Sequence, residues 1–134
     1  MELNKYIPGD LAMINGDIVK IMAVCFNYNL NIIQNYDVMF PNGNIYKYEA
    51  ESLKEIPLTP EILKKNGWRT QNRWYYYLDV AEGFISYIGI DFKHKSNKGH
   101  LYVEVDGNNM VEIQYCHELQ HLLYGLGIKH EMEM

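Results

Sequence analysis

Short apolar segments separated by Gly, Pro and Asn occupy the first part of the chain. Leu11–Ile14 and Asp17–Cys25 flank Asn15-Gly16, a pair that readily adopts the positive φ angles of a two-residue hairpin. Three further apolar segments follow, at Ile32-Ile33, Tyr36–Phe40 and Ile45–Tyr48. Segments this short, separated by turn residues, predict a small antiparallel barrel or rolled sheet.

A short helix is predicted near the middle of the chain. Thr59 is a favourable N-cap, and Pro60 suits the first helical position because its missing N–H group is not needed there. Lys64 and Lys65 match the negative end of the helix dipole, and Gly67 can end the helix in a left-handed conformation. The pattern therefore predicts a helix that begins at Pro60 and ends before Gly67.

The second half of the chain contains a further series of strand-like segments. They are Trp74–Leu78, Phe84–Phe92, Leu101–Val105 and Met110–Tyr115, with a polar loop at His94–Gly99. Because consecutive strands usually pair with each other, these segments predict an antiparallel meander.

The last predicted element is a helix from about Cys116 to Leu126. Its leucines recur at the spacing of one helical face, at Leu119, Leu122, Leu123 and Leu126. The whole chain therefore predicts an α+β domain with the final helix packed on the meander. We expect a β-barrel-like N-terminal lobe at residues 1–56 and a lobe of helix, meander and C-terminal helix at residues 57–134.

Composition and charge narrow the possible functions. The chain has 134 residues, 48% of them hydrophobic, which is enough for a buried core. Its formal net charge is −5, so the chain as a whole lacks the basic field that neutralises phosphates, and nucleic acid is not the expected partner. A local basic group, Lys64, Lys65, Arg69 and Arg73, keeps a nucleic-acid-binding module as a minor alternative.

The cysteines and the N-terminus indicate the expected location. Cys25 and Cys116 are the two cysteines, and they do not suggest a disulfide framework. The first residues, Met1 to Tyr6, lack the basic start and apolar stretch of a signal peptide. No apolar run approaches the roughly 20 residues of a membrane span. We expect a cytoplasmic protein without membrane contact.

His117-Glu118-Leu119-Gln120-His121 matches the H-E-x-x-H pattern of zinc peptidases. In those enzymes the two His bind Zn²⁺ from one helical face and the Glu activates a metal-bound water. The predicted helix places His117, His121 and Tyr124 together, opposite the leucine face. A zinc-dependent hydrolase with His117 and His121 as ligands and Glu118 as the catalytic base is therefore one hypothesis.

Two features of the sequence weigh against this hypothesis. A catalytic zinc site needs a third protein ligand. No helix follows that could supply a Glu, and Tyr124 stands where the extended H-E-x-x-H-x-x-G-x-x-H pattern needs Gly. Zinc peptidases also surround the motif with other helices, and little helix is predicted upstream. A polar helix face without metal or catalytic residues is the favoured interpretation.

Two segments resemble small proteins encoded by bacteriophages and integrated elements of gut anaerobic bacteria. Residues 56–68 are similar to their "PLTxEILxxxGF" segment, and residues 117–126 to their C-terminal "HxLQxLxxxL" segment. The N-terminal lobe also resembles SH3-like barrels, which often start at a Pro-Gly-Asp step such as Pro8-Gly9-Asp10. The phage pattern fixes the positions of His117, Leu119 and Gln120 and lets those of Glu118 and His121 vary. The resemblance implies that His117 and Gln120 are structural polar residues that hold the helix by hydrogen bonds.

The leading functional hypothesis is therefore a non-enzymatic phage or mobile-element accessory protein. It would bind another protein, or a second copy of itself, in the cytoplasm of a bacterial host, without a cofactor. Small size, acidic charge and 12 Tyr residues favour it. The alternative remains a zinc-dependent hydrolase.

Overall fold

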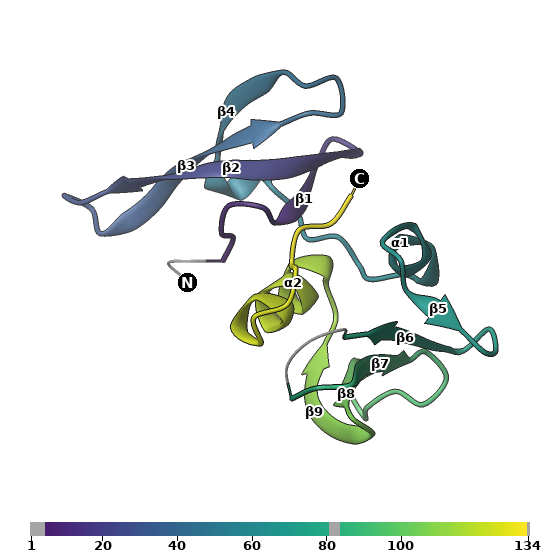
Figure 1. Ribbon diagram of the computed structural model, residues 1–134. Helices are drawn as coiled ribbons and strands as arrows, with labels where there is room; N and C mark the ends of the chain where they lie inside the picture. Colours follow the sequence, from purple (N-terminus) through teal and green to yellow (C-terminus); the bar gives the residue numbers. More distant parts are fainter. Residues whose placement is uncertain (1–4, 81–83, 134) are drawn as a thin grey trace.

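The computed structural model describes residues 5–80 and 84–133 as an α+β fold of two antiparallel sheets. The helices are α1 (Pro60–Lys65) and α2 (Cys116–Gly125), with a short 3-10 turn, η1 (Ala50–Ser52). Figure 1 shows α2 between the two sheets. Residues 1–4 and 134, at the predicted leaderless N-terminus and the end of the chain, lie outside the described residues. No helix in the described ranges is long and apolar enough to cross a membrane.

The N-terminal sheet is a four-stranded meander in the order β1-β2-β3-β4. Its strands are β1 (Leu11–Ile14), β2 (Asp17–Asn27), β3 (Ile32–Met39) and β4 (Ile45–Glu49). Among the described strands β1 and β4 are not paired with each other, so the sheet is open and the predicted SH3-like barrel is not closed. After β4 the chain returns to β1, where Met13 and Lys54 form an isolated bridge.

One continuous strand, β3, replaces the two separate segments predicted at Ile32-Ile33 and Tyr36–Phe40. Opposite it, Cys25 pairs with Asn35 and Phe26 pairs with Ile33, so Gln34 is an extra residue in a β-bulge. A second bulge leaves Met22 without a directly opposite residue. Because a bulge absorbs one residue, the polar Gln34-Asn35 pair interrupts the apolar pattern without ending the strand.

The second sheet is the predicted meander, in the order β5-β6-β7-β8-β9. Its strands are β5 (Arg69–Thr70), β6 (Tyr75–Asp79), β7 (Tyr87–Asp91), β8 (Leu101–Val105) and β9 (Asn108–Ile113). The sequence did not predict β5, and β7 begins at Tyr87 rather than Phe84. Gly89 is required in β7 because a Cβ there would overlap the Tyr75 hydroxyl group.

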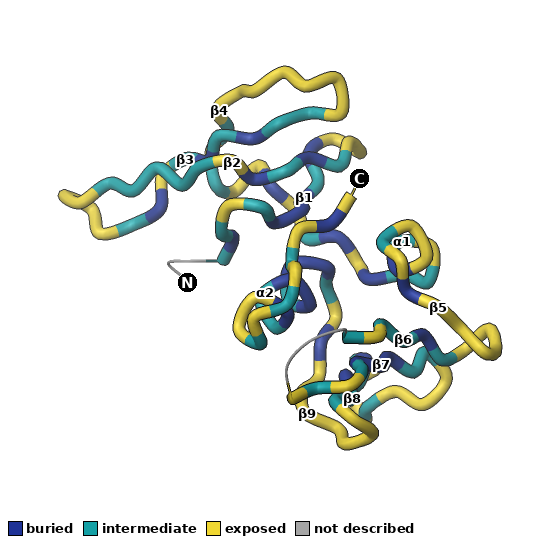
Figure 2. Tube along the Cα trace, viewed as in Figure 1, coloured by how far each residue is buried: buried dark blue, intermediate teal, exposed yellow. Residues whose placement is uncertain are grey.

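The hydrophobic cores of the two sheets meet at β1, which packs against a core on each face. Leu11 and Met13 belong to the larger core, with residues of α1, α2 and the second sheet, whereas Ala12 and Ile14 belong to the core of the first sheet. This alternation follows from the two-residue repeat of a strand. In Figure 2 buried stretches lie along β1 and α2. The apolar run Leu11–Ile14 is therefore continuous because both of its faces are covered.

The chain at the predicted boundary between lobes is tied to α2. The Ile56 carbonyl accepts a hydrogen bond from Cys116 N at 2.8 Å, and Leu58 N donates to the Gln114 carbonyl at 3.2 Å. Pro57 and Tyr115 also form a bridge. These contacts place the start of α2 beside the chain that connects the two sheets.

Candidate functional site

The predicted H-E-x-x-H residues lie on α2, at the junction between the two sheets. His117 and His121 share one side of the helix, with ring centroids 5.6 Å apart and nearly perpendicular rings. Leu119 and Leu123 are buried in the larger core on the opposite face. Helical spacing therefore places the two imidazoles together, as the sequence predicts.

Gln120 is completely buried and bonds to three segments of backbone. Its Oε1 accepts from Leu11 N at 2.9 Å, and its Nε2 donates to the Gly9 carbonyl at 2.9 Å and to the His130 carbonyl at 3.0 Å. These bonds join α2 to the start of β1 and to the C-terminal tail. Gln120 therefore joins three parts of the chain that are up to 111 positions apart in the sequence.

His121 contacts a buried carboxylate that the sequence analysis did not single out. Its Nε2 lies 2.6 Å from Asp10 Oδ2, which also accepts a hydrogen bond from Ile7 N at 2.9 Å. Asp10 is 0% exposed, and its Oδ1 makes no hydrogen bond within the described chain. The sequence places Asp10 only at the start of an extended stretch, after the turn at Pro8-Gly9, because nothing local indicates a contact across 111 positions.

Glu118 forms an N-terminal cap of its own helix. Its Oε1 accepts from Gln114 N and from Tyr115 N, each at 2.9 Å. A carboxylate in the first turn also suits the positive end of the helix dipole. One of the two oxygens of the carboxylate that a hydrolase would use as a base is thus bonded to the backbone.

His117 is buried among aromatic rings. Its ring lies 5.0 Å from that of Tyr6 and stacks on that of Tyr115 at 6.0 Å. His117 Nδ1 and the Tyr6 hydroxyl are both buried and make no hydrogen bond with the described residues. Burial lowers the pKa of His117, and nearby His121 lowers it further, so the ring is neutral near pH 7.

Two clefts lie against His117 and share the residues Lys5, His117 and Glu118. The first, about 510 Å³, opens between α2 and the N-terminal sheet and is lined by Tyr6, Tyr36 and Tyr115. The second, about 540 Å³, opens between α2 and β9 and is lined by His121 and Leu122. The sequence could not indicate Tyr6, because its ring reaches His117 only through the fold.

The described residues do not assemble a metal centre around the motif. Within residues 5–80 and 84–133, no group of three or more His, Cys, Asp or Glu is placed to hold a metal ion. His117 and His121 are the pair that the zinc hypothesis needs, and Asp10 is the acidic side chain at His121.

The basic residues considered for nucleic-acid binding interact mainly with aromatic rings. Arg69 pairs with Asp79 and lies over the Tyr77 ring at 5.2 Å. Arg73 lies over Trp74, and Lys64 over Tyr76, at 5.1 and 5.9 Å respectively. These contacts place Lys64 on α1 and Arg69 and Arg73 on the β5–β6 hairpin.

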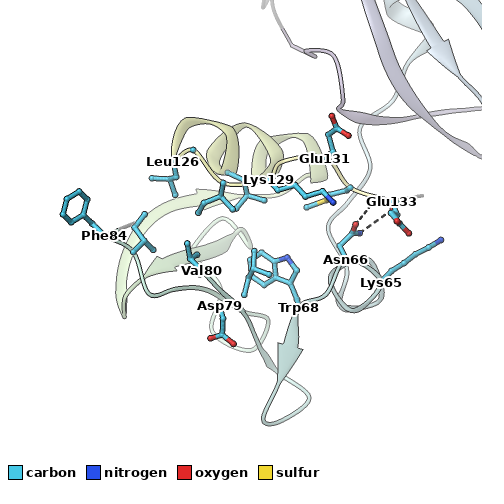
Figure 3. A pocket seen from close by; sticks show the side chains of 16 residues that line it. Lys65, Asn66, Trp68, Asp79, Val80, Phe84, Leu126, Lys129, Glu131 and Glu133 are labelled. Carbon is cyan, nitrogen blue, oxygen red and sulfur yellow. Dashed lines mark hydrogen bonds between the residues drawn. The ribbon is translucent and has the colours of Figure 1, made fainter. Parts of the chain in front are cut away.

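A groove of about 790 Å³, lined by both apolar and charged side chains, lies beside the C-terminal end of α2. Figure 3 shows Trp68 and Val80 on one side, and Leu126 and the tail that carries Lys129 to Glu133 on the other. Asn66 fastens this tail, since its Oδ1 accepts from Glu133 N at 2.7 Å. Phe84 lies at the end of the groove and is fully exposed.

The outer half of the β2–β3 hairpin extends beyond the rest of its sheet (Figure 1). Among the described residues β2 pairs with β1 only from Asp17 to Lys20, and β3 pairs with β4 only from Asn35 to Met39. At the tip, Tyr28 is 85% exposed and Leu30 is 63% exposed. We call residues 22–34 the ribbon.

Comparison of the chain with protein-family models, with curated proteins and with solved structures finds no match.

Proposed function

We propose that the protein is a non-enzymatic binding module that engages a protein partner through the tip of the ribbon. The observation that carries this proposal is the pair of exposed apolar side chains, Tyr28 and Leu30, on a two-stranded projection. A two-stranded hairpin without further strands is only marginally stable in water. Contact with another protein would bury the two side chains and stabilise the ribbon.

The tip is preordered for such a contact. The Asn27 side chain accepts hydrogen bonds from Asn29 N at 3.0 Å and Leu30 N at 3.2 Å, and its Nδ2 donates to Gln34 Oε1. The Phe26 and Tyr28 rings pack edge to face, with centroids 4.9 Å apart. An ordered loop loses less entropy on binding, which raises affinity without new contacts.

The chemistry of the tip defines the partner surface. Residues 27–31 are Asn, Tyr, Asn, Leu and Asn, so the tip carries no charge. Tyr is among the residues most enriched where binding energy concentrates in interfaces. The matching surface is an uncharged apolar recess on another protein, with amide or hydroxyl groups at its rim.

The mobile-element origin is part of the proposal and is supported by the resemblance of residues 56–68 and 117–126 to phage-encoded proteins. The zinc-hydrolase alternative has less support, because Glu118 caps its own helix. Gln120 and His121 hold α2 to the N-terminal segment, which suits a module whose helix fixes the sheet that carries the ribbon.

Site-specific photo-crosslinking in the native cells tests the ribbon. A crosslinking amino acid at Tyr28 is expected to capture a discrete partner, identified by mass spectrometry. The same amino acid at Met110, which is 60% exposed on β9, is the matched control and should not capture it. Leu30→Ser should abolish capture from position 28 while circular dichroism stays unchanged.

Three results would contradict the proposed function. They are equal capture from positions 28 and 110, capture that survives Leu30→Ser, and substrate turnover by the isolated monomer. A crosslinked dimer from position 28 would identify the partner as a second copy of the chain.

A further inference from the structure

Aromatic and acidic side chains line the cleft between α2 and the N-terminal sheet. Aromatic rings of Tyr6, Tyr36, Tyr115 and His117 line it, and the Tyr6 ring packs on both Tyr36 and His117. Aromatic faces carry partial negative charge, which attracts a cation held above them. These rings therefore favour a positively charged group.

Charged side chains at the cleft add to this preference. Glu51, Glu55 and Glu118 line it, against a single lysine, Lys5, among its lining residues. Carboxylates therefore outnumber the ammonium group among the residues that line the cleft. Burial of the ring, followed by the neighbouring Tyr36 hydroxyl and the buried Asp10 carboxylate, raises the pKa of the Tyr6 hydroxyl.

The wall also holds buried polar atoms without partners. The Tyr6 hydroxyl and His117 Nδ1 belong to residues only 2% and 6% exposed, and neither atom bonds to a described residue. Burial keeps His117 neutral, so one of its ring nitrogens is an acceptor. A phenol oxygen also accepts, so both atoms can be satisfied by a group that donates hydrogen bonds.

The chain already places one ammonium group at this cleft. Lys5 Nζ forms an ion pair with Glu55 and lies 5.8 Å from the centroid of the Tyr6 ring. This arrangement combines a carboxylate and an aromatic face around a primary amine. It shows which chemistry the cleft accommodates.

We propose that this cleft binds a primary ammonium or a guanidinium group on a short apolar stem. Glu55 pairs with the charge, the Tyr6 ring covers it, and the Tyr6 hydroxyl oxygen, together with His117 Nδ1 in the tautomer that carries the proton on Nε2, accepts its hydrogen bonds. Ile33 and Leu53, which also line the cleft, contact the stem. The group would belong either to a small free amine or to a Lys or Arg side chain of another protein. This inference does not rest on the ribbon, which is a separate surface.

Nuclear magnetic resonance titration of the full chain tests the cleft. n-Butylammonium and n-butylguanidinium should give saturable shifts of the Tyr6, Tyr115 and His117 amides, and butyrate at the same concentration should not. Nα-acetyl-lysine amide and Nα-acetyl-arginine amide represent the protein-borne groups. Tighter binding of the butyl compounds than of the acetylated amino acids supports a small-amine ligand, and tighter binding of the acetylated amino acids supports a protein side chain.

Variants separate ligand binding from folding. Glu55→Gln should weaken binding about five- to tenfold, because it removes the pairing charge but not the aromatic wall. Glu61→Gln makes the same change of charge at an exposed position of α1, and it should leave the affinity for the cations unchanged. Lys5→Met should strengthen binding several-fold, since it removes the competing ammonium. Tyr6→Phe should weaken binding while the ring and the fold remain.

The inference is overturned by any of three results: no saturable shift with any of the four cations, equal shifts with butyrate, or equal affinity of the Glu55→Gln and Glu61→Gln variants. None of these results bears on crosslinking from position 28, so failure of this inference and failure of the proposed function are distinguishable.

Discussion

Gln120 is the residue at which three separated parts of the chain meet, and its contribution can be measured. Gln120→Leu would leave Leu11 N and the carbonyls of Gly9 and His130 without their partner. Because unmade buried hydrogen bonds are costly, we expect a loss of about 2–4 kcal/mol in the free energy of unfolding. Urea denaturation followed by circular dichroism measures it.

The control for this substitution lies on the same segment of chain. Gln114 is exposed, so Gln114→Leu should change stability by less than about 0.5 kcal/mol. Equal stability of the Gln120→Leu variant and the unchanged protein would show that the three bonds do not hold α2 in place.

Residue spacing predicted part of the site and missed the rest for a physical reason. His117, Gln120 and His121 could be grouped because helical geometry relates residues that are close in sequence. Asp10 and Tyr6 could not, since each meets α2 across more than a hundred positions of the chain. Their partners depend on how the two sheets pack, which no local pattern specifies.

At the scale of the element, two substitutions at the start of α2 distinguish a capping role of Glu118 from a role as a catalytic base. Glu118→Gln keeps an oxygen that can accept from Gln114 N and Tyr115 N, whereas Glu118→Ala removes it. We therefore expect a stability loss of about 1 kcal/mol for Glu118→Ala and a much smaller loss for Glu118→Gln. Thermal unfolding of both variants measures the difference.

A catalytic role for Glu118 predicts a different result for these two variants. Gln cannot act as a base, so both substitutions would abolish turnover equally while stability stayed unchanged. Glu131→Ala, an exposed position beyond the helix, controls for the loss of one negative charge. Equal stability of all three variants would contradict the capping role.

Elements defined by local signals were predicted best. α1 begins at Pro60 after the Thr59 cap, as its sequence indicates, with Ile62 N donating to the Thr59 hydroxyl at 3.4 Å. The hairpin at Asn15-Gly16 has the positive φ angles expected, 49° and 87°. The open first sheet and the two-residue β5 were not predicted, because strand pairing is set by distant partners rather than by local sequence.

At the scale of the whole molecule, β1 makes the two sheets one structural unit. Its odd residues, Leu11 and Met13, pack in the larger core, and its even residues, Ala12 and Ile14, pack in the smaller one. Gln120 and Cys116 also bond α2 to the first part of the chain. The division predicted at residue 56 therefore separates two sheets that bury a common strand.

Cooperative unfolding follows from this shared strand. Val38 is fully buried in the smaller core, which belongs to the first sheet, and Trp68 is 4% exposed in the larger core. The fluorescence of Trp68 therefore reports on the unfolding of the second sheet. Val38→Ala should cost about 1–3 kcal/mol and should move the fluorescence and circular dichroism transitions to lower urea by the same amount. Ile88→Val, in the larger core, should also move both together. If the sheets unfolded independently, Val38→Ala would leave the urea midpoint of the Trp68 fluorescence transition unchanged. In that case β1 would not couple the stability of one core to that of the other.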